Sequence, residues 1–165
     1  MYKNKQGINV WEAKDGIKGN KAIIRPRVNG KEYEQGSVKT FTVTENTETQ
    51  SYNRLNDDPA IEEGPSTYEG SFTDYWGSPI WLTAYREFKQ KNGYAPDTDI
   101  IVDYVDTKTG RGRASYIVRG VKITSMPVIQ VDVDSTKLEG SYSFVAEAVE
   151  TVNGSGFKYT TGERR

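Results

Sequence analysis

Residues 97–151, DTDIIVDYVDTKTGRGRASYIVRGVKITSMPVIQVDVDSTKLEGSYSFVAEAVET, form the stretch that decides the fold. β-Branched and aromatic residues fill Ile100–Val105 and Tyr116–Val118, a composition typical of strands. The segment between them contains Gly110 and Gly112, and glycine readily adopts the positive φ angles of a hairpin turn. The two runs are therefore predicted to pair as an antiparallel hairpin.

The same stretch predicts further strands downstream. Val121–Ile123 and Val128–Val133 are rich in β-branched residues, and the intervening Pro127 marks a bulge or an edge because proline cannot donate to a ladder. A last strand has small or aromatic residues at every second position, which are Tyr142, Phe144, Ala146 and Ala148. A period of two indicates one buried and one solvated face.

The first half of the chain adds three strands. Lys21–Val28 is followed by Asn29-Gly30, a strong hairpin signal. Ser37–Thr49 places Phe41 and Val43 on one face and threonines on the other, and Ser66–Tyr75 again alternates. The chain is thus predicted to be mainly β.

One helix and one long loop complete the predicted elements. The helix covers residues 79–92, where Ile80, Trp81, Ala84, Tyr85 and Phe88 recur at helical spacing. Residues 45–64, ENTETQSYNRLNDDPAIEEG, are acidic and lack apolar periodicity, and are predicted to be a functional or mobile loop. The expected fold is a β-sandwich or barrel with one flanking helix.

The length of 165 residues favours one domain. We expect an extended N-terminal arm over residues 1–20, the β domain over 21–152 and a polar tail over 153–165. No run approaches the roughly 20 apolar residues of a membrane-spanning helix, so membrane insertion is not expected.

Composition narrows the chemistry. The chain has no cysteine and no histidine, which removes disulfides, thiolate sites and the commonest general base at neutral pH. An enzyme would need paired carboxylates such as Glu62 and Glu63, which are poorly held in a loop. Asp132 and Asp134 alternate with valines and are interpreted as a solvated strand face, since no calcium-loop spacing is present. No cofactor is expected.

Charge is distributed unevenly along the first half. Residues 1–31 hold eight Lys and Arg against Glu12 and Asp15, whereas residues 32–74 hold ten acids against Lys39 and Arg54. Such asymmetry favours a partner, because the two segments attract each other within one molecule or between copies, although a solvated basic tail beside an acidic loop is the simpler alternative.

The order of these elements, with short strings such as TGRGRASYIVRGVKITS and Val131-Asp132-Val133-Asp134, resembles the tail tube proteins of contractile phage tails and phage-tail-like particles of the PBSX type. The resemblance covers roughly residues 20–150. It implies a tail-tube-like fold, similar to that of the type VI secretion tube protein, and no catalysis.

The resemblance also implies an assembly. Subunits of that family form hexameric rings that stack into a hollow tube, a conduit for DNA or for envelope puncture, with a sheath, baseplate and terminator proteins as partners. The location would be a virion tail or phage-tail-like particle assembled in the bacterial cytoplasm. Acidic strand faces lining the lumen would suit a passing polyanion.

We expect contacts between subunits from the basic arm, the first strand and the acidic loop. The candidate residues are Trp11, Lys14, Lys18, Arg25, Arg27, Glu45, Glu48, Arg54, Leu55, Asp57, Asp58, Ile61, Glu62 and Glu63. The alternative is a monomeric β-sandwich binding module for carbohydrate or protein, which would use Trp76, Trp81 and tyrosines for stacking.

Overall fold

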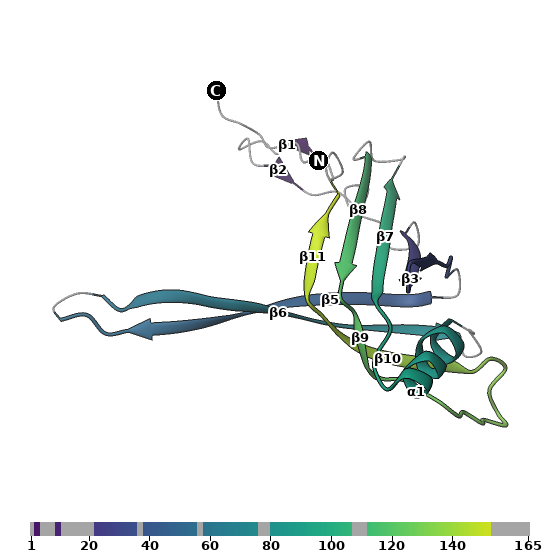
Figure 1. Cartoon of the computed structure of the whole chain (residues 1–165). Coiled ribbons are helices and arrows are strands. Elements are labelled where there is room, and N and C mark those ends of the chain that lie inside the picture. Colours follow the sequence, from purple (N-terminus) through teal and green to yellow (C-terminus); the bar gives the residue numbers. More distant parts are fainter. Residues whose placement is uncertain are drawn as a thin grey trace.

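The computed structural model describes residues 2–3, 9–10, 22–35, 38–55, 58–75, 80–106 and 112–152. Within these ranges, two antiparallel sheets pack together beside one helical segment (Figure 1). The predicted mainly β fold is confirmed, as a sandwich of two open sheets and not a closed barrel. The predicted N-terminal arm lies outside the described residues apart from the paired strands β1 (Tyr2–Lys3) and β2 (Asn9–Val10), and the whole predicted C-terminal tail, residues 153–165, lies outside them.

The five-stranded sheet has the order β11-β8-β7-β3-β4. Its strands are β3 (Ala22–Val28), β4 (Lys31–Glu32), β7 (Thr98–Asp106), β8 (Gly112–Arg119) and β11 (Ala148–Thr151). The predicted turn between β3 and β4 is present, with φ of 50° at Asn29 and 79° at Gly30. Both angles are positive, as a tight two-residue hairpin requires.

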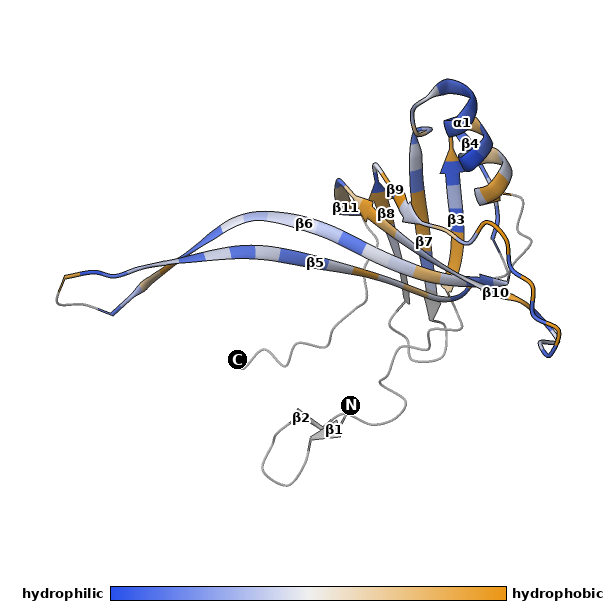
Figure 2. Ribbon diagram, turned by 90° about the horizontal axis from the view of Figure 1, so that it is seen from below, coloured by the Kyte–Doolittle hydropathy of each residue, from blue (hydrophilic) through white to orange (hydrophobic). Residues whose placement is uncertain are grey.

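The four-stranded sheet has the order β5-β6-β10-β9, with every neighbouring pair antiparallel. Its strands are β5 (Val38–Tyr52), β6 (Ala60–Tyr75), β9 (Lys122–Ser125) and β10 (Glu139–Ala146). In both ribbon views its strands run across those of the five-stranded sheet (Figures 1 and 2).

The prediction of a loop over residues 45–64 is wrong. Most of this stretch belongs to β5 and β6, which pair from Val38 opposite Asp74 to Tyr52 opposite Ala60. The loop was predicted because the strands are polar on both sides here, so no apolar periodicity marks them.

The prediction of a strand over Val128–Val133 is also wrong for the single chain. After β9 the chain has no strand until β10 begins at Glu139. Asp132 and Asp134 therefore do not form a strand face, and the amide of Asp134 instead donates to Asp132 Oδ1 at 3.0 Å. Alternation of apolar and polar residues indicates that a segment suits a half-buried strand, but the strand forms only where a partner strand is present.

The predicted helix is confirmed for its described residues. It comprises a π-helix, η3 (Ile80–Glu87), followed by the α-helix α1 (Phe88–Asn92). Gly93 ends it with φ of 77°, and its amide donates to the carbonyl of Lys89 at 2.9 Å. A residue with positive φ after the last turn is a common helix terminator.

Aromatic rings from the four-stranded sheet and the helix form the centre of the core. The Phe72 ring lies 4.6 Å from that of Tyr142, nearly parallel, and 5.2 Å from that of Trp81. The five-stranded sheet covers them with buried aliphatic residues, namely Ile24, Val28, Ile100, Val102 and Val118. This burial fixes which face of each sheet points inward.

A buried polar chain ties the sheet to the helix. Gln35 donates to Asp74 and accepts a hydrogen bond from Trp81 Nε1 at 3.2 Å. Asp74 and Trp81 are both fully buried. Because unpaired polar groups are expensive inside a core, this chain fixes the position of η3 against β6.

Gly70 in β6 is predicted to be required for this packing. A Cβ there would overlap the Phe144 ring and lie 2.7 Å from the carbonyl oxygen of Thr42. Gly70→Ala should therefore lower the free energy of unfolding by about 1–3 kcal/mol, measured by denaturant titration. Ser71→Ala, on the exposed face next to it, is the control and should change it by less than about 0.5 kcal/mol. Equal stability of the two variants would contradict the packing described.

Tyr142 should make stability fall at high pH. Burial, and then the charge of Asp74, raise the pKa of Tyr142 above its ordinary value. A raised pKa in the folded state means that the protonated hydroxyl contributes fully to the free energy of unfolding below about pH 10. This contribution is lost as the pH rises through the raised pKa. Tyr142→Phe should flatten the alkaline fall in unfolding free energy; an unchanged pH profile would refute this assignment.

Candidate assembly surfaces

A two-stranded arm projects from the sandwich (Figure 1). The arm consists of residues 45–52 of β5, residues 60–67 of β6 and the turn between them. β10 pairs with β6 only over residues 68–75, so no third strand covers the arm within the described residues. Its strands extend for about 26 Å. Every described arm residue except Ala60 is exposed.

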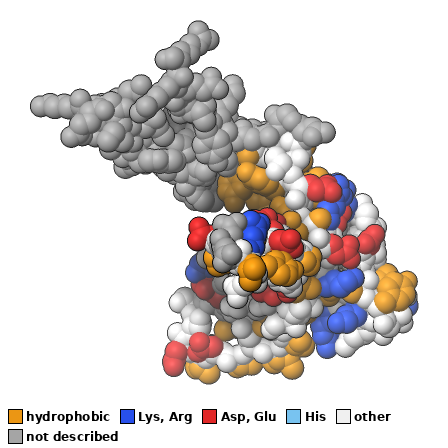
Figure 3. All heavy atoms as spheres, turned by 90° about the vertical axis from the view of Figure 1, so that its left-hand side faces the viewer, with side chains coloured by type: hydrophobic (Ala, Val, Ile, Leu, Met, Phe, Trp, Pro, Cys, Tyr) orange, Lys and Arg blue, Asp and Glu red, His pale blue; other side chains and the backbone are white. Residues whose placement is uncertain are grey.

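The arm has a distinct chemistry at its tip. Tyr52 is 48% exposed, Leu55 95% and Ile61 72%. The rest of the arm is hydrophilic (Figure 2), and an end-on view shows hydrophobic and charged side chains together at its end (Figure 3). Exposed apolar residues at the end of an acidic ribbon are typical of a contact surface.

A bulge interrupts the arm. Thr47 pairs with Ser66 and Thr49 with Glu63, so Gly64 and Pro65 together oppose Glu48. Pro65 donates no amide to the ladder, and a Cβ on Gly64 would lie 3.3 Å from the Cβ of Glu48. Bulges increase twist and blunt a strand edge against unspecific pairing.

The arm brings together most of the predicted contact residues of the acidic segment. They are Glu45, Glu48, Arg54, Leu55, Asp58, Ile61, Glu62 and Glu63. Four others, Trp11, Lys14, Lys18 and Asp57, lie outside the described residues. A contact of any of these residues with another subunit stays a prediction.

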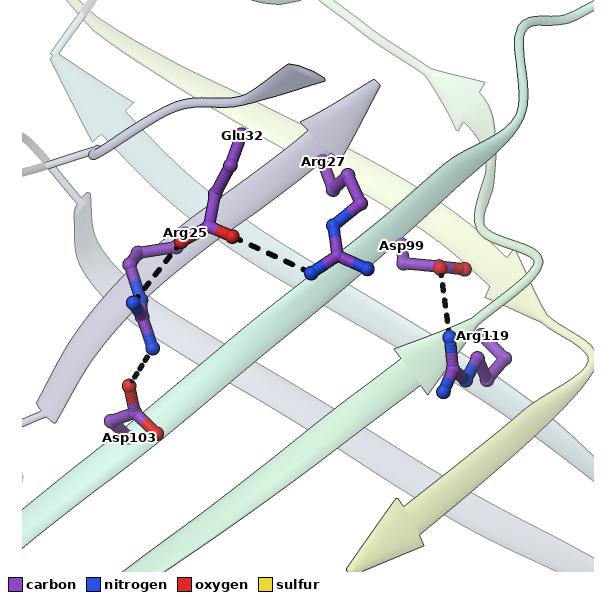
Figure 4. Close-up of polar contacts among 6 residues, drawn as sticks. All are labelled: Arg25, Arg27, Glu32, Asp99, Asp103 and Arg119. Atoms are coloured by element: carbon purple, nitrogen blue, oxygen red, sulfur yellow. Dashed lines mark hydrogen bonds and ion pairs between the residues drawn. The ribbon is translucent and has the colours of Figure 1, made fainter. Parts of the chain in front are cut away.

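Arg25 and Arg27 lie elsewhere, on the outer face of the five-stranded sheet (Figure 4). Glu32 pairs with both, at 3.1 Å to Arg25 and 3.4 Å to Arg27, and Arg25 also pairs with Asp103. Arg25 and Arg27 therefore already have partners within the chain.

A second group of ion pairs lies on the same sheet. Arg119 Nη1 lies 3.2 Å from Asp99 Oδ2, and Arg119 Nε lies 3.1 Å from Glu150 Oε2. The hydrogen bond to Glu150 is the main cause that raises the pKa of Arg119.

The exposed face of the four-stranded sheet is covered with hydroxyl groups. We call it the hydroxyl face; its side chains are Thr40, Thr42, Thr44, Ser71, Thr73, Ser141 and Ser143. Directly opposite residues point to the same side of a sheet. The sequence contained this signal as Ser or Thr at every second position, yet only the register shows that three strands align them.

Charges on this face occur in opposite signs. Lys39 Nζ donates to Glu139 Oε1 at 2.5 Å, and this hydrogen bond raises the pKa of Lys39. Glu69 and Lys122 both stand opposite Val145, so they lie in one cross-strand row. The acidic lining expected from Asp132 and Asp134 is not present on this face.

The four-stranded sheet is open at its β5 edge. β5 pairs with β6 on one side, and no described strand lies on the other. At the opposite edge, the amide of Val121 donates to the carbonyl of Thr98 at 2.8 Å and the amide of Ile123 to the Tyr85 hydroxyl at 3.0 Å. Only the end of β9 and the chain after it remain open there. Unpaired edges invite another chain.

Some residues named for the alternative functions are not placed for those functions in the described part of the chain, and Trp76 lies outside that part. Glu62 and Glu63 are consecutive in a strand, so their carboxylates point to opposite faces. Trp81 is fully buried and cannot stack on a sugar. In the described part of the chain, no group of acidic residues could hold a metal ion. No helix in that part is long and apolar enough to cross a bilayer.

No protein-family model matches the sequence, and no curated protein matches it. Several solved structures are similar to the structure of this chain. A chain of the sheath–tube complex of an extracellular contractile injection system (PVC, extended state) superposes with a TM-score of 0.64 at 13% identity, covering 84% of this chain and 93% of that one. The tube-terminating cap of the anti-feeding prophage gives 0.62 at 13% identity, over 87% and 93%. The SPP1 tail tube gives 0.61 at 13% identity, over 82% and 78%.

The chain has the tail-tube fold. At these identities the likeness establishes the fold alone. Within the tail-tube fold, the arm, the hydroxyl face and the open β5 edge are surfaces that no other described strand covers.

Proposed function

We propose that this protein is a structural subunit of a hollow tube, formed from hexameric rings that stack along an axis. The tube would belong to a phage tail or a phage-tail-like particle and would conduct DNA or puncture an envelope. The observation that carries the proposal is the arm, since a two-stranded ribbon exposed on both faces is at best marginally stable by itself. Contact with another copy would stabilise it.

Strand directions support closure through the four-stranded sheet. Because all neighbours are antiparallel and the number of strands is even, β5 and β9 run in opposite directions. Copies joined edge to edge around a ring therefore continue the antiparallel pattern. The five-stranded sheet has an odd number, so joining its edges would create a parallel pair.

The widths of the two sheets support an inner position for the four-stranded sheet. Four strands span roughly 19 Å, whereas β7, running across them, is about 30 Å long. Both dimensions run around the ring, and in a closed ring the outer layer has the larger circumference. The five-stranded sheet, which is wider in this direction, therefore fits outside, and the hydroxyl face lines the lumen.

A hydroxyl-covered lumen suits a conduit. Serine and threonine are neutral and hydrated, and the charges beside them occur in opposite signs, so a passing polyanion would meet no cationic patch. The neighbours with the same fold occur in a sheath–tube complex and a tube cap. We propose corresponding partners here: a sheath, a baseplate and a terminator, in a particle assembled in the bacterial cytoplasm.

Removing the arm should abolish tubes and leave the sandwich folded. Asn46 and Thr67 are paired, so residues 47–66 can be replaced by an Asn-Gly turn without changing the register of the body. The control, Thr47→Ala with Ser66→Ala, removes only one exposed hydrogen bond of 2.9 Å. Electron microscopy should show tubes for the wild type and the control and none for the truncated chain. Tubes from the truncated chain would contradict a role of the arm in assembly.

Cysteine accessibility should identify the lumen. The chain has no cysteine, so Ser71→Cys on the hydroxyl face and Ile23→Cys on the opposite side, 44% exposed in the wild type, each create one thiol. In intact tubes, a polymer-linked maleimide too bulky for the lumen should label position 23 and not position 71. A small maleimide should label both. Equal labelling by the bulky reagent would place the hydroxyl face outside.

A further inference from the structure

The segment between β9 and β10 exposes apolar side chains in a regular pattern. Ile129 is 82% exposed, Val131 85% and Val133 95%. Gln130, Asp132 and Asp134 alternate with them, so an extended chain would have one apolar and one polar edge. Residues 128–134 thus have the composition of a half-buried strand, and no strand in the described part of the chain pairs with them. We call it the docking segment.

A groove with matching chemistry lies along the open edge of β5. It is lined by apolar and small side chains of β3, β5 and β7, namely Ala22, Ile24, Val38, Phe41, Val102 and Tyr104, together with Lys39, Thr40 and Thr42. The groove runs where the two sheets diverge at β5, a strand that pairs on one side only. Its floor is apolar, and its outer lip carries hydroxyls and the cation Lys39.

The docking segment cannot fill the groove of its own copy by continuing the sheet. The segment follows β9, and β9 and β5 form opposite borders of the four-stranded sheet. Tyr85 already satisfies the amide of Ile123, so only the chain beyond β9 is available for new pairing. In a ring, this chain meets β5 of the next copy.

We propose that the docking segment becomes a strand by pairing with β5 of a neighbouring copy in the same ring. Ile129, Val131 and Val133 fill the apolar groove, while Asp132 and Asp134 join the hydroxyl face beside Lys39. The direction of β9 makes this pair antiparallel, and the aspartates lie near Lys39, which also binds Glu139 of its own copy. The inference rests on the proposed function, because it requires a closed ring.

Disulfide trapping tests the pairing. Thr42→Cys is combined in turn with Gln130→Cys, Asp132→Cys and Asp134→Cys, which all belong to the polar edge of the docking segment. Oxidation should give a ladder of covalent oligomers that ends at a closed ring for at least one combination. Thr42→Cys with Thr83→Cys, an exposed position on η3, is the control and should give none.

Loss of the apolar edge gives a second readout. The triple variant Ile129→Ser, Val131→Ser, Val133→Ser changes only side chains that the single chain exposes, so it should fold as the wild type does and form no tubes. If the wild type forms tubes, normal tubes from this variant would overturn the proposed pairing of the docking segment, and so would the absence of a ladder from every cysteine pair. Either result would leave the proposed function standing. A wild type that forms no tubes would overturn the proposed function and the docking segment together.

Discussion

Backbone hydrogen bonding at the border of a sheet is the constraint on which this structure depends. Each unpaired strand edge presents amide and carbonyl groups that must bond to water or to another chain. Among the described residues, β5 has such an edge along its length, and its arm half pairs with β6 alone. The single chain thus has a fully packed core, but the backbone groups at the edge of its four-stranded sheet lack partner strands.

The core explains why the border can remain open without loss of the fold. Phe72, Trp81 and Tyr142 pack as one aromatic cluster, and Gln35 links Asp74 to the helix. These contacts define the inner face of the four-stranded sheet independently of any neighbour. The opposite face is consequently free to carry hydroxyl groups, and the arm is free to be polar on both sides.

Sequence reasoning succeeded where burial leaves a local pattern. The alternation of Tyr142 and Phe144, the Asn29-Gly30 turn and the apolar spacing around Trp81 all predict elements that the structure contains. Each of these signals comes from contacts within the chain. The predicted interface residues on the arm are exposed, but they belong to strands and their turn and not to a long loop, and their contact with another subunit stays a prediction.

Sequence reasoning failed where the partner of a strand is remote or not in the chain. The arm was predicted as a loop because residues 47–50 have no apolar face, although β6 pairs with them on both sides of the bulge at Glu48. The docking segment was predicted as a strand because Ile129, Val131 and Val133 alternate with polar residues, although none of the described strands pairs with it. The register that aligns Thr42, Ser71 and Ser143 is equally a property of three distant segments. Local composition does not contain that information.

Amide hydrogen exchange, compared between the single chain and the assembled protein, measures directly whether the backbone amides at the sheet edge are hydrogen-bonded. Amides of β5 and of residues 128–134 should exchange rapidly in the single chain and become protected on assembly, while those of β7 and β10 should be slow in both. Protection of β5 in a chain that stays monomeric at high concentration, or assembly without any change at these two segments, would contradict this expectation.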